Sequence, residues 1–148
     1  MMTEKWDLRF LRLAKEISTW SKDPSSKIGV VIVNDDRRVL ATGYNGFPRG
    51  VEDTSERLID REQKYPLIIH AELNALLNAL YSGVSVKDAT LYVYGLPVCS
   101  DCAKGIIQVG IKRVVMPVQE IPKHWDESWS ETKAMFDEAG VKYEFLEA

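Results

Sequence analysis

Hydrophobic residues recur at helical spacing near the start of the chain. They are Trp6, Phe10, Leu13, Ala14, Ile17 and Trp20. This spacing is typical of the buried face of an amphipathic helix. Thr3 precedes the segment as an N-cap candidate. The polar stretch 21–26 contains Asp23-Pro24, which should end the helix.

Two β-rich runs follow, at 28–33 and 39–44, and the first consists almost entirely of valine and isoleucine. The four polar residues 34–37 between them predict a hairpin. The next stretch, 45–66, is polar and charged, and so long a connection in a compact domain is more often functional than idle. We interpret it as a candidate lid or effector loop, in which 52–64 forms a solvated face.

The second half of the chain alternates helical and strand patterns. Helices are expected at 70–81, at 99–109 and along a stripe of Trp125, Trp129, Thr132, Phe136 and Ala139 that ends at Gly140, and strands at 90–94, 113–116 and 141–146. Such alternation implies right-handed crossovers and a sheet covered on both faces. We therefore predict an α/β fold, a three-layer α/β/α domain over 1–148 with a five-stranded mixed sheet.

Composition and charge narrow the class of protein. A chain of 148 residues with 45% hydrophobic and 28% charged residues can bury a core without disulfides or metal staples. Its net charge of −3 disfavours a polynucleotide partner, which would need clustered lysine and arginine. The sequence shows neither an apolar run of the ~18 residues that span a bilayer nor an apolar signal core. A cytoplasmic protein without a membrane partner is the expectation.

Two short motifs carry candidate chemistry: His70 with Glu72, and Cys99 with Cys102. Three apart in a helix, the two cysteines share a face, so both sulfurs can reach one zinc ion at about 2.3 Å, and the helix dipole favours the thiolates. With His70 as the third ligand, a fourth position stays open for water, whose pKa bound zinc lowers toward ~7. Glu72 is then placed to move protons.

Each motif alone is weak, because His-x-Glu is often solvated surface and Cys-x-x-Cys can be a redox pair or half of a structural zinc site. The two cysteines are the only ones in the sequence, which excludes a four-cysteine site, although His124 could close a structural one. A redox pair is expected after a first strand, whereas this pair follows the third. Together the motifs favour a catalytic zinc site.

The residues that flank these motifs extend the pattern. They are Ser-Lys-Asp-Pro-Ser-Ser-Lys-Ile-Gly at 21–29, Gly-Tyr-Asn-Gly-Phe-Pro-Arg-Gly at 43–50, Tyr-Pro at 65–66, His-Ala-Glu-Leu-Asn-Ala at 70–75 and Cys-Ser-Asp-Cys-Ala-Lys at 99–104. With them, the chain resembles the deoxycytidylate deaminases of the cytidine deaminase-like superfamily, zinc enzymes with this signature. It departs from them at Val98: the family usually has a proline directly before the first cysteine, whereas here Val98 separates Pro97 from Cys99.

The resemblance implies hydrolytic deamination of dCMP to dUMP, with one Zn²⁺ per chain and Glu72 as the proton shuttle. It also implies that Asn45 binds the deoxyribose hydroxyl, and that the N–H of Ala71 and the carbonyl near Pro97 hold the pyrimidine edge. For the 5′-phosphate we expect Lys22 beside Ser21, with a solvated loop lysine as the alternative.

Members of this group are often hexamers activated by dCTP and inhibited by dTTP. The resemblance therefore implies a homo-oligomer, with a triphosphate and its Mg²⁺ at Gly46 and Arg49, or a solvated lid in the simpler interpretation. A second, structural zinc is not expected. Two alternatives stay open: a deaminase of a nucleoside, a base or tRNA adenosine, and a non-catalytic nucleotide-binding zinc protein.

Overall fold

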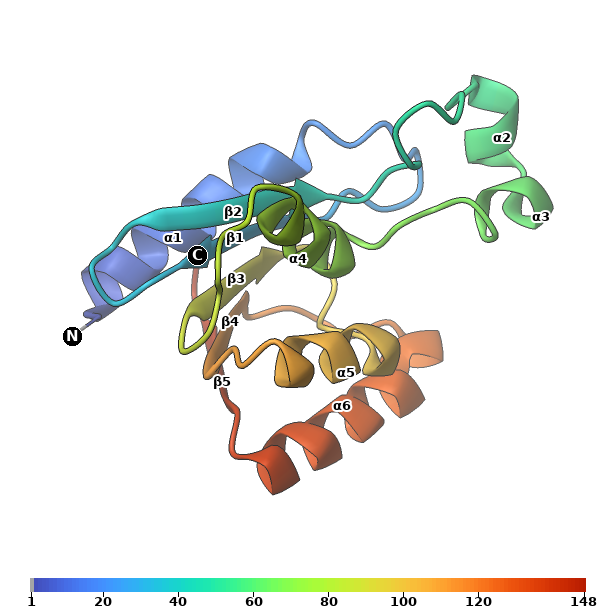
Figure 1. The fold of residues 1–148 in the computed structure, drawn as a ribbon. Helices are drawn as coiled ribbons and strands as arrows, with labels where there is room; N and C mark the ends of the chain where they lie inside the picture. Colours follow the sequence, from blue (N-terminus) through green and yellow to red (C-terminus); the bar gives the residue numbers. More distant parts are fainter. Residues whose placement is uncertain (1) are drawn as a thin grey trace.

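The structure is a computed structural model that describes residues 2–148. Its elements are α1 (Glu4–Ser18), β1 (Gly29–Val33), β2 (Val39–Tyr44), α2 (Ser55–Ile59), α3 (Arg61–Lys64), α4 (Ala71–Tyr81), β3 (Thr90–Tyr94), α5 (Ser100–Gln108), β4 (Arg113–Pro117), the 3₁₀ turn η1 (Lys123–Trp125), α6 (Asp126–Ala139) and β5 (Lys142–Leu146). Helix α1 packs on one face of the sheet and α4, α5 and α6 on the other (Figure 1). The predicted α/β/α layering is confirmed.

The five strands form one mixed sheet in the order β2-β1-β3-β4-β5. Strand β1 is antiparallel to β2 and β3, whereas β3, β4 and β5 run parallel. Gly29 pairs with Tyr44 and with Tyr94, so β1 begins beside the ends of β2 and β3. The loops at this end of the strands therefore lie close together, and they carry most of the candidate residues.

Side chains of β1 alternate between two hydrophobic cores. Val30 and Ile32 face α4, α5 and α6, whereas Val31 and Val33 face α1. All five residues of this strand are buried. Strands covered on both faces read as continuous apolar runs, which is why this one shows no polar alternation in the sequence.

Two glycines set how closely the helices lie on the hairpin. A Cβ at Gly43 would lie 2.4 Å from the backbone nitrogen of Ala75 in α4, and one at Gly29 would lie 2.1 Å from the carbonyl oxygen of Ala14 in α1. Glycine in a strand often marks such a close backbone approach. The position of α4, and of the motif at its start, therefore depends on Gly43.

The predicted stripe of α1 is wrong at two positions. Leu13 is 37% exposed and Trp20 is 55% exposed, because the helix ends at Ser18 and its buried face is rotated toward Asp7. The Asp7 carboxylate can be buried because it accepts hydrogen bonds from the Tyr92 hydroxyl and the Arg113 guanidinium. Thr3 occupies the N-cap position without a side-chain cap hydrogen bond.

The segment 45–66 is also more structured than predicted. It contains α2 and α3, which lie beyond the end of the sheet in Figure 1. The expectation of a wholly solvated face is wrong at Leu58 and Lys64, which are both buried. The Lys64 ammonium forms an ion pair with the Asp23 carboxylate at 3.1 Å. This pair joins the segment to the loop that follows α1.

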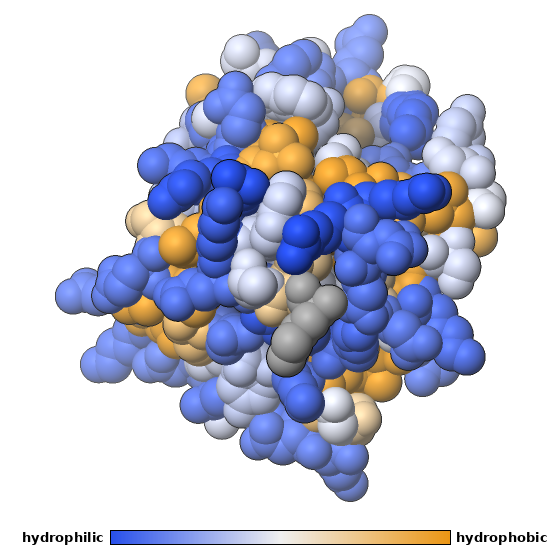
Figure 2. Space-filling model, turned by 90° about the vertical axis from the view of Figure 1, so that its left-hand side faces the viewer, coloured by the Kyte–Doolittle hydropathy of each residue, from blue (hydrophilic) through white to orange (hydrophobic). Residues whose placement is uncertain are grey.

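The opposite end of the molecule carries the N-terminus and the β1–β2 turn. Hydrophilic side chains cover most of this end, with hydrophobic ones in scattered patches between them (Figure 2). Within residues 2–148, none of the helices combines the length and the apolar character needed to cross a membrane. Gly140 follows the last residue of α6 and adopts the left-handed conformation (φ 80°) expected of a C-cap.

Candidate active site

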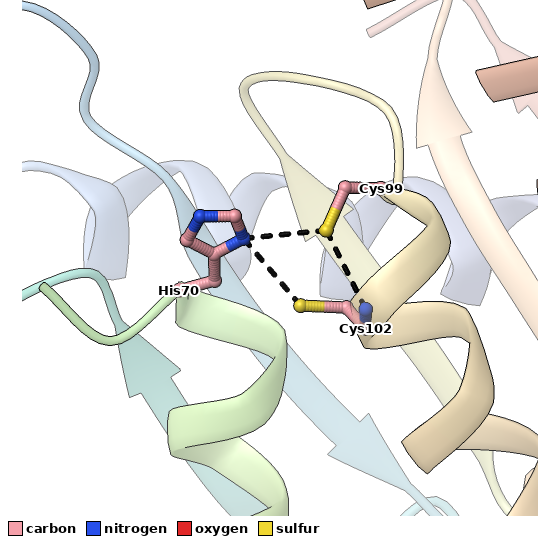
Figure 3. Close-up of side chains that lie close together, drawn as sticks. All are labelled: His70, Cys99 and Cys102. Atoms are coloured by element: carbon pink, nitrogen blue, oxygen red, sulfur yellow. Dashed lines mark hydrogen bonds between the residues drawn. The ribbon is translucent and has the colours of Figure 1, made fainter. Parts of the chain in front are cut away.

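The histidine and both cysteines of the two motifs come together at the ends of two helices. His70 is the N-cap of α4, Cys99 is the N-cap of α5, and Cys102 lies in the first turn of α5. The His70 Nδ1 atom lies 3.3 Å from the Cys99 sulfur and 3.6 Å from the Cys102 sulfur (Figure 3). Side chains 29 and 32 residues apart in sequence thus converge.

This geometry fits a zinc ion. Tetrahedral zinc with bonds of 2.0–2.3 Å separates neighbouring ligand atoms by about 3.6 Å, close to the two distances between His70 and the sulfurs. All three ligand atoms lie within 4.8 Å of one another. One imidazole and two thiolates form a donor set that zinc prefers, and three protein ligands leave a position for a reactant. In residues 2–148 the group does not include His124, so a closed structural site is not formed.

Local hydrogen bonds favour one thiolate before any metal binds. The Cys102 side chain, His70 and the Cys102 backbone N–H all bond to the Cys99 sulfur, and they lower the pKa of Cys99 to about 4. The hydrogen bond to Cys99, together with burial, raises the pKa of Cys102, and the same sulfur raises the pKa of His70. Binding of a metal would therefore release protons from this group.

Glu72 lies in the first turn of α4 and is only 4% exposed. Burial, with a smaller contribution from the Cys99 thiolate, raises the pKa of Glu72 to about 7. A carboxyl group with a pKa near neutrality can both accept and return a proton at physiological pH, as a general acid–base requires.

Glu72 and His70 open onto a cavity of ≈ 320 Å³, within the size range of small-molecule sites. Three of the other expected substrate residues also line it: Asn45, Ala71 and Pro97. The rest of the lining was not singled out as substrate-binding in the sequence: Asp23, Ser25, Ser26, Ile28, Arg61, Lys64, Tyr65, Ile68, Leu96, His124 and Trp125. Arg61 and Lys64 come from the charged segment after Asn45, so only the length of that segment pointed toward them.

Asn45 is held by the loop that precedes β1. Its Oδ1 accepts from the Ile28 N–H at 2.9 Å, and its Nδ2 donates to the Ser26 carbonyl at 2.8 Å and to the Asp23 carboxylate at 3.3 Å. Both amide hydrogens are therefore used, and toward a ligand Asn45 can only accept a hydrogen bond. A sugar hydroxyl can donate to such an acceptor, so the expected contact is compatible with this arrangement.

Ser21 and Lys22 do not belong to the cavity lining. The Ser21 hydroxyl donates to the Asn45 carbonyl at 2.8 Å, and thus helps to hold this loop. The Lys22 ammonium pairs with Asp53 at 3.1 Å, and its side chain is 68% exposed. The solvated alternative fits Lys22 better than the phosphate contact does, because Lys22 has a partner outside the cavity.

Gly46 and Arg49, the expected effector residues, lie outside the cavity lining as well. Gly46 exchanges two backbone hydrogen bonds with Ile69, directly before His70. The Arg49 guanidinium donates to the Asn78 side chain at 3.0 Å and lies 4.7 Å above the Tyr81 ring. Arg49 therefore contacts α4, and Gly46 contacts the segment that leads into it. Their effector role stays a prediction.

Comparison with known proteins places this geometry in a family. Residues 4–118 match the model described as the cytidine and deoxycytidylate deaminase zinc-binding region. The chain belongs to this deaminase family. The family's zinc-binding region contains the three clustered ligands, so the protein is a zinc-dependent deaminase and hence a hydrolase.

Similar proteins cover nearly the whole chain. A protein named "uncharacterized deaminase in luxG 3′region" from Aliivibrio fischeri is 37% identical, over 98% of this chain and 96% of its own. The mouse deoxycytidylate deaminase is 38% identical, over 94% of this chain and 78% of its own. Two crystal structures of the dCMP deaminase from cyanophage S-TIM5, apo and with dCMP and dUMP, align with TM-scores of 0.79 and 0.80, at 25% and 24% identity, over 98% and 99% of this chain and all of theirs. The predicted cytidine deaminase-like fold is confirmed.

Proposed function

We propose that this deaminase converts dCMP to dUMP and ammonia. The observation that carries the proposal is that one cavity is lined by His70 and Glu72 and also by the cations of Arg61 and Lys64. The first pair suits deamination, and a cation on the same cavity wall suits a phosphate group. The mouse relative named deoxycytidylate deaminase and the cyanophage enzyme crystallised with dCMP and dUMP support the same substrate.

In the proposed reaction, the protein's own groups move protons and hold the ring. Zinc bound by the three ligands would lower the pKa of a water molecule toward about 7. Glu72 takes one proton from the attacking water and delivers it to the ring nitrogen N3. It then takes the second proton from the new hydroxyl group at C4 and gives it to the amine, which leaves as ammonia while C4 becomes a carbonyl. The raised pKa of buried Glu72 suits this order of steps, because its carboxyl group can hold each proton between uptake and delivery.

Two backbone groups are placed to orient the pyrimidine. Ala71 is the first residue of α4, so its N–H has no acceptor within the helix and can donate to the ring. The Pro97 carbonyl already accepts a hydrogen bond from the Trp125 indole at 2.8 Å. A carbonyl oxygen has two lone pairs, so Pro97 can accept a second bond from the substrate amine.

Arg61 is the best-placed contact for the 5′-phosphate. The Lys64 ammonium is buried against the Asp23 carboxylate, which already neutralises its charge. Arg61 is exposed and lies over the Tyr65 ring, 6.0 Å from its centroid. Its planar guanidinium can bind a phosphate through two parallel hydrogen bonds. We therefore assign the phosphate contact to Arg61 in place of Lys22.

Replacing Arg61 with alanine should raise the KM for dCMP by about 10–100-fold, the value of one or two charge-assisted hydrogen bonds. Turnover of deoxycytidine should change little, because it has no phosphate. Ammonia release is measured with dCMP, dCTP, deoxycytidine, cytidine and tRNA. Arg57→Ala is the matched control, since its guanidinium bonds to the Glu52 carbonyl outside the cavity. A preference of the unaltered enzyme for unphosphorylated cytidine would contradict the proposed substrate.

We further propose a homo-oligomer, a hexamer by resemblance, that dCTP with Mg²⁺ activates and dTTP inhibits at Gly46 and Arg49. Apolar side chains on the solvent side of α4 support an oligomer, namely Leu73, Leu77, Leu80 and Tyr81, which are 42–78% exposed. The cation of Arg49 lies against Tyr81 on this helix. A ligand that bound Arg49 would therefore act directly on α4.

Light scattering should give a mass several times that of one chain, and dCTP with Mg²⁺ should lower the KM for dCMP severalfold. Arg49→Gln removes the charge that would meet a triphosphate, so it should abolish the dCTP effect and spare basal turnover. Arg57→Ala again serves as the control. A monomer, or a dCTP response that survives Arg49→Gln, would contradict this assignment.

A further inference from the structure

One face of α6 holds the backbone that leads into Cys99. Trp125, the N-cap of α6, donates its indole N–H to the Pro97 carbonyl at 2.8 Å. One turn further on, the Ser128 hydroxyl accepts from the Ser100 N–H at 2.8 Å, and then the Thr132 hydroxyl donates to the Val98 carbonyl at 2.9 Å. We call Trp125, Ser128 and Thr132 the α6 clamp. The clamp bonds to three of the four residues from Pro97 to Ser100.

Two of these bonds satisfy backbone groups that have poor alternatives. Val98 and Thr132 are fully buried, so without the hydroxyl the Val98 carbonyl would lose its buried partner. Leaving such a group unpaired costs about 1–3 kcal/mol. Ser100 is the first residue of α5, and its N–H has no acceptor within that helix. The backbone on both sides of Cys99 is therefore fixed from outside α5.

Trp125 also reaches the other side of the ligand group. Its ring lies 6.5 Å from the His70 ring, tilted by 34°, and it lines the cavity. The Trp125 side chain thus packs beside His70 and also bonds to the loop that leads to Cys99. A shift of Trp125 would change both, together with the Pro97 carbonyl that faces the substrate.

We propose that the α6 clamp positions Cys99 for zinc and the Pro97 carbonyl for substrate, and that Trp125 is a positioning residue for the deamination. The metal part rests on the zinc site of the family, and the substrate part rests on the proposed function. Groups that orient the ligands of a metal site typically contribute 10–100-fold to metal affinity or activity. The clamp contributes in this way through the backbone on either side of a ligand.

The test measures zinc release to an excess of chelator, without substrate. Thr132→Val keeps the shape but removes the hydroxyl, and Trp125→Phe keeps an aromatic ring but removes the N–H. Both should release zinc about 10–100-fold faster than the unaltered protein. Thr132→Ser restores the hydroxyl and should release zinc at nearly the original rate. The control is Tyr143→Phe, which removes a hydrogen bond to Asp137 in the last turn of α6, beyond the clamp.

A second readout is the absorption spectrum of the cobalt-substituted protein, whose thiolate bands report the geometry around Cys99. These bands should shift in Thr132→Val and Trp125→Phe, and stay in place in Tyr143→Phe. Unchanged release and unchanged bands in Trp125→Phe would overturn the proposal, even if the melting temperature fell. Should Thr132→Val fail to fold, Trp125→Phe and Ser128→Ala decide.

The substrate part has its own measurement. Trp125→Phe should lower kcat about tenfold and leave KM nearly unchanged for whichever nucleotide is turned over, because the Pro97 carbonyl acts on the reacting amine. An unchanged kcat would overturn this part. If dCMP proved not to be the substrate, the zinc release and cobalt results would still stand, so failure of the clamp and failure of the proposed function are distinguishable.

Discussion

Replacing Glu72 with glutamine should reduce turnover by about 10²–10⁴-fold, the usual contribution of a general acid–base. The amide has nearly the shape of the carboxylate but cannot take a proton from water. Zinc should stay bound at one ion per chain, because the three clustered ligand residues are unchanged. Ammonia release at saturating dCMP and metal analysis of the same sample measure the two expectations together.

Asp101→Asn is the matched control, since Asp101 is an exposed carboxylate on the first turn of α5. It should retain turnover within about twofold, as expected for a solvated surface charge. Wild-type turnover in a zinc-loaded Glu72→Gln protein would exclude Glu72 as the proton shuttle and leave the zinc site as it is.

The same variant should alter how the stability of the metal-free protein depends on pH. Burial raises the pKa of Glu72 from 4.5 to about 7. A raised carboxyl pKa means that ionisation is less favourable in the folded chain than in the unfolded chain. Ionisation of Glu72 therefore lowers the free energy of unfolding as pH rises from 4.5 through 7. Glutamine does not ionise. Across this pH window, the free energy of unfolding of Glu72→Gln should therefore rise relative to that of the unaltered protein, by up to about 3 kcal/mol.

Removing zinc should lower both activity and stability. Alanine at Cys102 deletes one of three ligands, so turnover should fall by at least 10³-fold, on the order of the loss of a catalytic group. At zinc concentrations about 100-fold above the dissociation constant, bound metal adds about 2.7 kcal/mol of stability. For a domain of this size that corresponds to about 5–10 °C in melting temperature.

Calorimetry with and without chelator tests this. The unaltered protein should melt at a lower temperature with chelator and recover when zinc is added back, whereas Cys102→Ala should respond to neither. A chelator-treated protein that kept full activity and its melting temperature would contradict a catalytic zinc site.

Much of the fold follows from local patterns. The hairpin strands, the helix from His70 and the C-cap at Gly140 were all predictable, because spacing and turn residues act between neighbours. The cysteines share a helical face for the same reason. Even here the pattern had limits: Leu13 and Trp20 fit the helical spacing but are exposed, since only packing decides which side of a stripe is covered.

The sequence by itself determined which residues could bind zinc and move protons, because His70 with Glu72 and Cys99 with Cys102 each act through a spacing of two or three residues at a helix start. The packing of α4 beside α5 then brought the two motifs together. Only the tertiary structure decided which cations reach the cavity. Lys64 is buried because Asp23, 41 residues away, supplies its counter-charge, and Arg61 lines the cavity while Lys22 pairs with Asp53 outside it. The α6 clamp bonds to backbone 28–34 residues away. Such contacts depend on how whole elements pack, and no local spacing encodes them.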